Sequence, residues 1–587
     1  MLFAELAKTF DRIESEPSRL SMTAILSDFL KTVEADEISD VIFLSQGKLR
    51  PDFYPQVFGM SDKLVIKAIT STVGMPESEV TEIVIKEGDP GTAAEKLIKK
   101  KKQMTLFSHP LTLERVVKSL ENIENSEGRD SQNRKTKILS NMLHDSEPVE
   151  ARYLCRIVTG RMRVGAGTMT ILDALADAFA TKEDRPEIER AFNITCDMGL
   201  VATTVAEGGM DAIRKIEVGV GNPLKVMLAE RLRSIPEVVE RLGGRCAMEY
   251  KYDGIRIQAH IKKDSVKLYS RRLEDLTPNF PDVAATLRER CKVEEAIVEG
   301  ECVAVDEETG YMLPFQEITH RRKKHGIGEA ITDYPVRMFL FDMLYSDGED
   351  LTHEPYLDRR SAIEKNFDIS GDLQMTTMRI VSSPEEGQQF FDEALAARCE
   401  GIMAKSISQE SIYRAGSRGF LWIKYKRDYQ QALVDTFDLS VVGAFHGRGK
   451  RAGKYGALLM AAYDEDSGRF GTACKLGTGF DDEFLDKLPD MLEPYRSLDK
   501  PSSVDAQMIP DVWFEPYIVL EVTGAEMSIS PIHTASMGHI KDDSGLGIRF
   551  PRFTGRVRND KDATESTTYS EMTDLYLLQE QDPEDPS

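Results

Sequence analysis

The chain has 587 residues, and its 75 lysines and arginines against 99 aspartates and glutamates give a formal net charge of −24. Hydrophobic residues make up 41% and charged residues 30%, which is typical of a globular protein and excludes a disordered or fibrous chain. This length predicts roughly three or four domains. The acidic total excludes a uniformly basic nucleic-acid coat, but it allows a local basic groove, because binding depends on where charge lies.

Cysteine usage and the chain start indicate a cytoplasmic protein. The seven cysteines are scattered singly without a CxxC pair, which argues against a zinc site and fits a reducing compartment. The start, MLFAELAKTFDRIESE, lacks the basic and apolar regions of a signal peptide. No long apolar run occurs, and even segment 336–345 contains Arg337 and Asp342, so we expect no membrane span.

Residues 1–220 are predicted to form an all-α domain. Apolar residues recur at three- and four-residue spacing in the segments 2–13, 18–33, 113–123, 153–160 and 170–180. Ser108, Thr112 and Thr168 are candidate N-caps. Glycines and a proline within 217–232 predict a linker after this domain.

Two further domains are expected. Residues 221–430 predict a mixed α/β domain, with strand patterns at 247–261, 265–272, 295–305 and 336–345 and a helix at 383–399. Residues 431–587 predict an all-β barrel, with strand patterns and glycine-rich turns at 439–464, 471–479 and 517–530. The final residues, DPEDPS, predict a frayed tail.

Lys251 is the candidate nucleophile. It stands in EYKYDGIR (249–256), near a predicted strand end and beside the turn-forming pair Asp253-Gly254. A neutral lysine amine can attack phosphorus, and nearby cations favour the neutral form by lowering the lysine pKa. Alone, this motif fits a surface hairpin with an idle lysine better than an active site.

Carboxylates and paired lysines elsewhere fit a phosphate site. Glu301 in EGE (299–301) and Glu400 in EGIMAK (400–405) are candidate Mg²⁺ ligands, because carboxylates near phosphate usually hold that ion. Lys424 and Lys426 alternate in WIKYK (422–426), so both point to one face of a predicted strand. Each feature alone also fits a solvated strand end or edge.

Together the motifs resemble a known family. Their order and approximate spacing match the nucleotidyltransferase motifs: KYDGIR (251–256), SRR (270–272), EGE (299–301), FDMLY (341–345), EGIMAK (400–405), WIKYK (422–426) and RFPRF (549–553). Over essentially its whole length the chain resembles an ATP-dependent DNA ligase of the archaeal replicative type. The resemblance implies a helical DNA-binding domain, an α/β adenylation domain of mixed antiparallel type and a C-terminal OB-fold.

The resemblance also implies a role for each matching residue. Lys251 would take AMP from ATP as a phosphoramide, Glu249 would contact the adenine amino group, and Phe341 would stack on the adenine ring. The ribose and phosphates of ATP would bind Arg256, Arg271, Glu301, Arg418, Lys424 and Lys426. Glu301 and Glu400 would hold Mg²⁺, with Mn²⁺ as an alternative. The leaving pyrophosphate would be oriented by Arg549, Arg552, Arg556, Arg558 and Lys561, although Thr554-Gly555 departs from the expected pattern.

The implied partner is nicked duplex DNA, bound by a monomer in the cytoplasm near the nucleoid. DNA binding should be salt-sensitive and largely independent of sequence, with candidate basic patches at 161–163 and at 448–451 with Lys454. A hinge is expected at 428–432. Gln103, Leu106 and Phe107 resemble a short sliding-clamp-binding box, although Leu106 and Phe107 also fit ordinary core positions.

Competing interpretations remain at this point. An RNA ligase or a capping guanylyltransferase is disfavoured by RFPRF and by the long helical region. An NAD-dependent ligase is disfavoured by the missing cysteine cluster and the missing N-terminal module. A non-enzymatic DNA-clamping protein would not need Lys251, Glu301 and Glu400 together.

Overall fold

The computed structural model describes residues 1–54, 58–87, 89–100, 109–162, 164–306, 310–313, 315–321, 327–426, 436–447, 454–524 and 526–580. Several predicted features lie outside these residues: Gln103, Leu106, Phe107, Ser108, Arg163, the segment 448–451, the hinge at 428–432 and the tail. Within the described residues, no helix is both long enough and apolar enough to pass through a bilayer.

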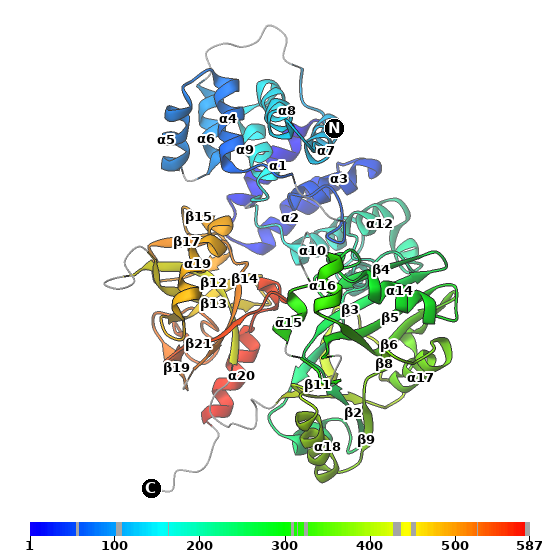
Figure 1. Ribbon diagram of the computed structural model, residues 1–587. Helices are drawn as coiled ribbons and strands as arrows, with labels where there is room; N and C mark the ends of the chain where they lie inside the picture. The colour runs from blue at the N-terminus through cyan, green and yellow to red at the C-terminus, as the bar shows by residue number, and fades with distance from the viewer. Residues whose placement is uncertain are drawn as a thin grey trace.

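The N-terminal region is helical, as predicted (Figure 1). Its helices are α1 (Phe3–Glu14), α2 (Arg19–Leu30), α3 (Ala35–Ser45), α4 (Asp62–Val73), α5 (Glu77–Glu87), α6 (Pro90–Lys99), α7 (Leu113–Glu124), α8 (Ser131–Asp145), α9 (Pro148–Val158), α10 (Thr168–Phe179), α11 (Arg185–Thr195) and α12 (Met198–Ile213). Their apolar faces share one core that contains Phe3, Phe10 and Leu154. The Thr112 side chain caps α7 by accepting the Arg115 N–H at 3.2 Å, whereas the N-cap of α10 is Gly167 instead of Thr168.

The segment 217–232 is not a free linker. Leu224 and Met227 are buried, and β1 (Leu228–Arg231) pairs in parallel with β11 (Arg418–Lys426). The Gln258 side chain accepts the Leu224 N–H at 2.8 Å and donates to the Leu224 carbonyl at 3.3 Å. The glycines and the proline therefore lie where the chain enters the central domain, and strand pairing and hydrogen bonds hold this segment against that domain.

Two sheets form the central domain, which confirms the mixed α/β prediction. One has the order β1-β11-β10-β2-β9, where the last three are β10 (Gly401–Ser406), β2 (Cys246–Lys251) and β9 (Met378–Val381). The other has the order β4-β3-β5-β6-β7, formed by β4 (Ser265–Ser270), β3 (Ile255–Lys262), β5 (Ala296–Ala304), β6 (Val336–Ser346) and β7 (Glu349–Asp350), and β8 (Leu373–Met375) pairs in parallel with β6. The domain's helices are α13 (Ile235–Arg241), α14 (Pro281–Arg290), α15 (Phe315–Thr319), α16 (Ile327–Asp333), α17 (Tyr356–Asn366) and α18 (Pro384–Ala396).

The predicted strand 247–261 is two strands that belong to different sheets. β2 ends at Lys251, and β3 begins at Ile255 in the other sheet. Gly254 allows this crossing, because a Cβ atom there would lie 2.3 Å from the Cys302 carbonyl oxygen. Lys251 therefore stands at the end of an interior strand of one sheet, where the chain crosses to the other sheet.

The C-terminal domain is β-rich but not all-β. Its larger sheet contains β12 (Thr436–His446), β13 (Tyr455–Asp464), β14 (Arg469–Leu476), β15 (Arg496–Ser497), β16 (Val504–Asp505), β17 (Val512–Phe514), β18 (Val519–Thr523) and β21 (Arg552–Val557), and β19 (Glu526–Ser530) pairs with β20 (Gly545–Arg549). The domain also contains two helices that the sequence analysis did not predict: α19 (Asp482–Leu492) and α20 (Tyr569–Glu580). The buried Leu485, Leu488 and Leu492 recur at three- and four-residue spacing, which is typical of a helix. The many turn residues in this region favoured strands and turns instead.

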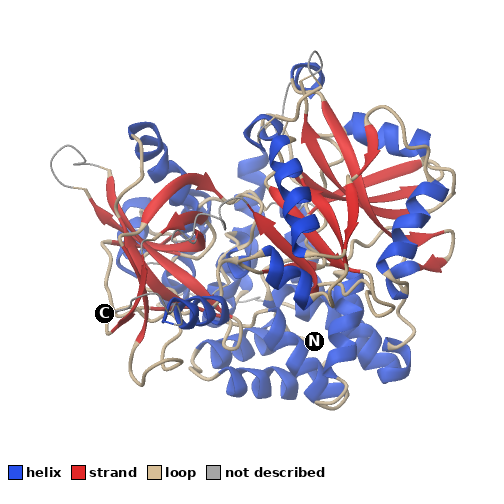
Figure 2. Cartoon of the chain, turned by 90° about the horizontal axis from the view of Figure 1, so that it is seen from below, coloured by secondary structure: helices blue, strands red, loops and turns tan. Residues whose placement is uncertain are grey.

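The C-terminal domain packs against the central domain. Figure 2 shows the two groups of strands side by side, with helices of the N-terminal region beneath them. In Figure 1, the red helix α20 lies on the side of the C-terminal domain that faces the central sheets. The candidate site lies at this junction.

Candidate active site

Strand register gathers the key side chains on one face of the first sheet. Gly401 on β10 is opposite Lys251 on β2 and Lys426 on β11, so these three residues form one cross-strand row. In the next row Met403 is opposite both Glu249 and Lys424. Because directly opposed residues point to the same face, both rows face the same space.

Gly401 has a steric role in this arrangement. A Cβ atom at this position would lie 2.1 Å from the Tyr425 carbonyl oxygen. The glycine therefore allows β10 and β11 to pair closely between the two lysines. This explains why a glycine follows Glu400 in EGIMAK.

A cavity of about 610 Å³ lies over this face, between the two central sheets and the C-terminal domain. Its lining includes all of the predicted nucleotide-binding residues: Glu249, Lys251, Arg256, Arg271, Glu301, Phe341, Arg418, Lys424 and Lys426. Glu400, Arg556, Arg558 and Lys561 also line it. The volume lies within the range of small-ligand pockets.

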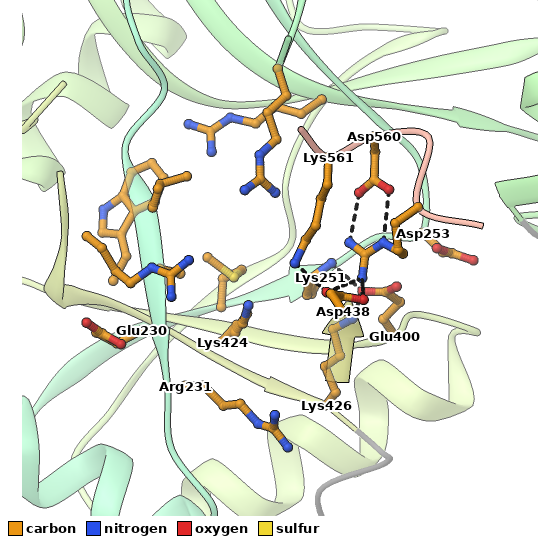
Figure 3. A pocket seen from close by; sticks show the side chains of 18 of the residues that line it. Glu230, Arg231, Lys251, Asp253, Glu400, Lys424, Lys426, Asp438, Asp560 and Lys561 are labelled. Atoms are coloured by element: carbon orange, nitrogen blue, oxygen red, sulfur yellow. Dashed lines mark hydrogen bonds and ion pairs between the residues drawn. The ribbon is translucent and has the colours of Figure 1, made fainter. Parts of the chain in front are cut away.

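Three cations converge on Glu400 at one end of the cavity (Figure 3). The Lys251 Nζ donates a hydrogen bond to its carboxylate, and Lys426 Nζ and Arg556 Nη1 lie at 3.3 Å from its two oxygens. Burial alone would raise the pKa of Glu400, but Lys251, Lys426 and Arg556 hold that pKa well below its usual range. Glu400 is therefore ionised.

Glu301 has the opposite electrostatic character. Burial in the cavity raises the pKa of Glu301 to about 7, although Lys251 and Arg256 favour its ionised form. Two neighbouring carboxyl groups thus differ in charge near neutral pH. Such a divergence is typical of functional sites.

Aromatic and apolar side chains line the other end. The Phe341 and Trp422 rings meet edge to face with centroids 6.1 Å apart, and the Arg256 guanidinium lies 5.3 Å and 5.4 Å from their centroids. Met403 lines the same region. This end can accept a flat ring, whereas the Lys251 end can accept phosphate.

Glu249 is enclosed in a buried polar cluster. Its Oε1 accepts hydrogen bonds from the Tyr356 hydroxyl, from Arg360 at 2.6 Å and from Thr376 at 2.9 Å. Lys405 Nζ lies 2.6 Å from its Oε2 and within 4.7 Å of the centroids of three aromatic rings. Of the two carboxylate oxygens, Oε2 therefore has more capacity to accept a further donor.

The C-terminal domain supplies charged groups to the phosphate end. Lys561 and Arg558 both form ion pairs with Asp438, and Arg558 Nη1 lies 3.0 Å from the Asp438 carboxylate. Burial and the nearby Lys561 lower the pKa of Lys424 well below its usual range. This domain also reaches two predicted nucleotide-binding arginines: Arg418 pairs with Glu571 of α20, and Arg271 lies 3.3 Å from Glu565.

Two predicted residues are not brought to the cavity. Arg549 ends β20 and Arg552 begins β21, and both are exposed outside the cavity lining. The part of the last motif that reaches the cavity begins only at Arg556. The insertion Thr554-Gly555 lies between these two parts.

Sequence reasoning missed several lining residues. Met403 and Lys405 alternate with Gly401 along β10, so period-two spacing could have placed them on the face that holds Lys251. Arg231, on β1, is opposite Lys424 and lies near it in Figure 3, but its strand was predicted as linker. Asp438 on β12 and Glu521 on β18 are directly opposite each other in the C-terminal sheet, and no local sequence pattern marks them.

The carboxylates fit Mg²⁺ better than a metal held by protein alone. Across the described ranges, no group of three or more His, Cys, Asp or Glu side chains is arranged to hold a metal ion. Mg²⁺ usually keeps several waters and binds one or two carboxylates together with substrate phosphates. Glu301 and Glu400, at the end of the cavity that holds Lys251, match this donor set.

Comparisons with known proteins show the family of the chain. Family models match three regions: the DNA ligase N terminus over residues 2–176, the ATP dependent DNA ligase domain over 226–426 and the ATP dependent DNA ligase C terminal region over 451–561. The chain is 46% identical to "DNA ligase 2" of Thermofilum pendens, over 98% of this chain and 97% of that protein. It is 45% identical to "DNA ligase" of Sulfophobococcus zilligii, over 98% and 96%.

The chain therefore belongs to the family of ATP-dependent DNA ligases. The resemblance on the seven motifs is confirmed. The arrangement of a helical region, a nucleotidyltransferase domain and a C-terminal β-rich domain is confirmed as well.

Proposed function

We propose that this protein seals nicks in duplex DNA with ATP, in replication, repair and recombination, through a Lys251–AMP intermediate. The observation that carries the proposal is the row formed by Lys251, Gly401 and Lys426, with Glu400 beside it and an aromatic base-binding end in the same cavity. This row places an amine between a ring-binding surface and a set of phosphate-binding cations.

Three phosphoryl transfers make up the reaction. The Lys251 Nζ, after losing its proton, bonds to the α-phosphorus of ATP as the bond to the β-phosphate oxygen breaks and pyrophosphate leaves. A 5′-phosphate oxygen at the nick then bonds to that phosphorus and displaces the lysine. Finally the 3′-hydroxyl, losing its proton, attacks the 5′-phosphorus and releases AMP. Positioning and charge neutralisation carry most of the catalysis in transfers of this kind.

The residues have distinct parts in these steps. Lys426 and Arg556 lie around the carboxylate that holds Lys251, so their positive charges are close to the attacking amine. We assign the α-phosphate to Lys424 and Lys426, with Arg418 and Arg271 as further phosphate and ribose contacts. We assign the pyrophosphate to Arg556, Arg558 and Lys561, because all three line the cavity. Arg549 and Arg552 lie outside the lining, so their positions do not support the same role.

We assign the adenine ring to Phe341 and its amino group to the Oε2 of Glu249. Glu301 and Glu400 would hold Mg²⁺, or Mn²⁺ in its place, and the metal would neutralise phosphate charge when bound. Two observations support this metal-binding role. The pKa of Glu400 lies well below its usual range, and Glu301 lines the cavity.

DNA binding is proposed to use phosphate contacts and to require an opening of the C-terminal domain. Arg161, from a predicted basic patch, bonds to Asp62 at 3.1 Å and to the Pro494 carbonyl at 3.3 Å, and Lys454 pairs with Asp486. Both side chains would have to leave these partners to reach DNA. Binding should then weaken with salt.

Further parts of the proposal concern organisation. We propose domain boundaries near residues 220 and 430, a monomeric and cytoplasmic protein associated with the nucleoid, and a sliding-clamp contact through Gln103, Leu106 and Phe107. The clamp contact rests on the sequence pattern alone, since those three residues lie outside the described part of the chain.

The test is sealing of a labelled nicked duplex with ATP and Mg²⁺ by the wild type and by Lys251→Ala. We expect the wild type to seal and the variant to lose both sealing and labelling with AMP. Salt-sensitive DNA binding without sealing by either protein would instead favour a non-enzymatic clamp, and sealing by both would remove Lys251 as the nucleophile.

A further inference from the structure

Arg256 is held by a buried network that includes Glu299 and Tyr413, two residues outside the cavity lining. Glu299 on β5 is fully buried, and its carboxylate accepts hydrogen bonds from Arg256 Nη2 at 2.7 Å, from the Tyr413 hydroxyl at 3.0 Å and from Gln258 Nε2 at 3.2 Å. Neither Glu299 nor Tyr413 is among the residues that line the cavity. These two residues can therefore affect a ligand only indirectly, through lining residues that they contact, such as Arg256.

The guanidinium of Arg256 is fixed at both of its terminal nitrogens. Nη2 donates to Glu299, and Nη1 donates to the Met227 carbonyl at 2.9 Å. Nε is buried and has no hydrogen-bond partner among the described residues. Since Arg256 lines the cavity beside Phe341 and Trp422, this fixed guanidinium can contact a ligand there.

Tyr413 connects the two anchors of Arg256. Its hydroxyl accepts the Met227 N–H at 2.9 Å and donates to Glu299. Burial and the charge of Glu299 raise the pKa of Tyr413 well above its usual value, so the hydroxyl keeps the proton that it donates. The carbonyl and the N–H of Met227 are therefore both tied to this network.

We propose that Glu299 and Tyr413 are positioning residues that fix Arg256 for nucleotide binding. They hold its terminal nitrogens against Glu299 and Met227, so that the guanidinium keeps one orientation toward ATP at the aromatic end of the cavity. This inference rests on the proposed function, since the ligand is the ATP of that reaction. Preorganisation of this kind lowers the cost of binding, because the arginine has lost its freedom beforehand.

A neighbouring ion pair provides a matched control. Asp342 on β6 is directly opposite Glu299 in the register, and it is equally buried. Its two oxygens accept hydrogen bonds from Arg359 at 2.7 Å and 3.0 Å. Neither Asp342 nor Arg359 lines the cavity, so this pair should contribute to folding without acting on the nucleotide.

The first experiment is the ATP dependence of Lys251 labelling in single-turnover reactions, for Glu299→Gln and for Asp342→Asn. The Gln side chain keeps the shape and removes the charge that orients Arg256. We expect Glu299→Gln to raise the half-saturating ATP concentration about tenfold, with the maximal rate within about threefold of the wild type. Asp342→Asn should lower the Tm at least as much as Glu299→Gln does, but it should leave the ATP dependence of labelling unchanged.

A double-mutant cycle separates positioning from a general loss of structure. If Glu299 acts through Arg256, then Arg256→Met and the double variant Arg256→Met/Glu299→Gln will show the same ATP dependence. Tyr413→Phe, a milder change, should give a rise of about threefold and keep the variant folded if Glu299→Gln fails to fold. The proposal is overturned if the effects of Arg256→Met and Glu299→Gln on the half-saturating ATP concentration multiply in the double variant. It is also overturned if Asp342→Asn weakens ATP use as much as Glu299→Gln.

Equilibrium binding of ATP to Lys251→Ala, with and without Glu299→Gln, distinguishes this inference from the proposed function. Weaker ATP binding by the Glu299 variant supports the positioning role even if the wild type proves unable to seal DNA. Equal binding by the two proteins contradicts the positioning role while leaving the ligase activity intact.

Discussion

The two halves of the cavity are held in place by different kinds of interaction. In the central domain, Lys251 and Glu249 project from β2 and Lys424 and Lys426 from β11. These strands lie on either side of β10, so the relative positions of the four side chains follow from backbone register. The C-terminal half is joined to the central half chiefly by ion pairs, such as Arg556 with Glu400 and Glu571 with Arg418.

This difference indicates a division of labour. Register can change only if the sheet is rebuilt, so the central half should be present in every step. Ion pairs across an interface can separate at low cost, because each partner can be solvated on opening. The C-terminal half should therefore serve the step in which ATP is enclosed and withdraw when DNA enters.

The largest effect is expected from Gly401→Ala. The added methyl group would lie 2.1 Å from the Tyr425 carbonyl, so β10 and β11 must separate and the lysine row is lost. Sealing and labelling with AMP should both fall by at least about a hundredfold. The control is Gly419→Ala on β11, where a Cβ meets no atom within 4 Å, so its activity should stay normal. Normal activity of Gly401→Ala as well would contradict the claim that strand register positions the lysines.

Lys405→Met tests the base-binding end of the central half. The change removes a buried cation next to Glu249 but keeps most of the side-chain volume. We expect the half-saturating ATP concentration for labelling to rise about tenfold, because Glu249 loses a partner that holds its carboxylate. Arg321→Met, which removes another buried cation of the same domain away from the cavity lining, should leave ATP use unchanged.

The double change Asp562→Asn/Glu565→Gln tests the ion pairs of the C-terminal half. These carboxylates lie 3.7 Å from Arg272 and 3.3 Å from Arg271, and they would compete with DNA phosphates for the two arginines. In the Lys251→Ala background, we expect affinity for nicked duplex to rise by about fivefold at low salt. The same charge change on α19, Asp482→Asn/Glu483→Gln, measures the effect of net charge alone on DNA affinity. An equal rise in affinity for this control would show that release of Arg271 and Arg272 is not the cause.

The smallest effect concerns pH. The pKa of Glu301 is raised to about 7 by burial, so this carboxyl is protonated below that pH and ionised above it. Because a metal requires the ionised form, the Mg²⁺ concentration for half-maximal labelling should fall severalfold as pH rises from about 6 to about 8. Glu301→Gln should remove this pH dependence, and an unchanged dependence in that variant would assign it to another group.

The same contrast explains what the sequence could predict. Lys251, Glu400, Lys424 and Lys426 were found because short motifs on strands keep their spacing, and a strand has a simple period. Arg231 was hidden because glycines around it favoured a linker, whereas its pairing with β11 depends on a residue nearly two hundred positions away. Asp438, Glu521 and Glu571 reach the cavity only through domain packing, which has no local signature.

The prediction of the last motif shows the same limit within one segment. RFPRF and RVR were treated as one functional unit, but the chain places Arg549 and Arg552 on the surface and Arg556 and Arg558 in the lining. Side-chain direction depends on where β21 pairs with β18, and the register shifts within that pairing. Helix α19 was missed for a different reason, since a single short helix lies among many turns.

The division of labour is tested most directly with Arg556→Ala, by comparing labelling of Lys251 from ATP with the joining of a nicked duplex that already carries AMP on its 5′-phosphate. Arg556 lies at 3.3 Å from Glu400 across the interface, so we expect labelling to fall by about a hundredfold. Joining of the adenylated nick, which needs no pyrophosphate contact, should stay within about threefold of the wild type. Equal losses in the two reactions would contradict the account, because the C-terminal half would then act in every step.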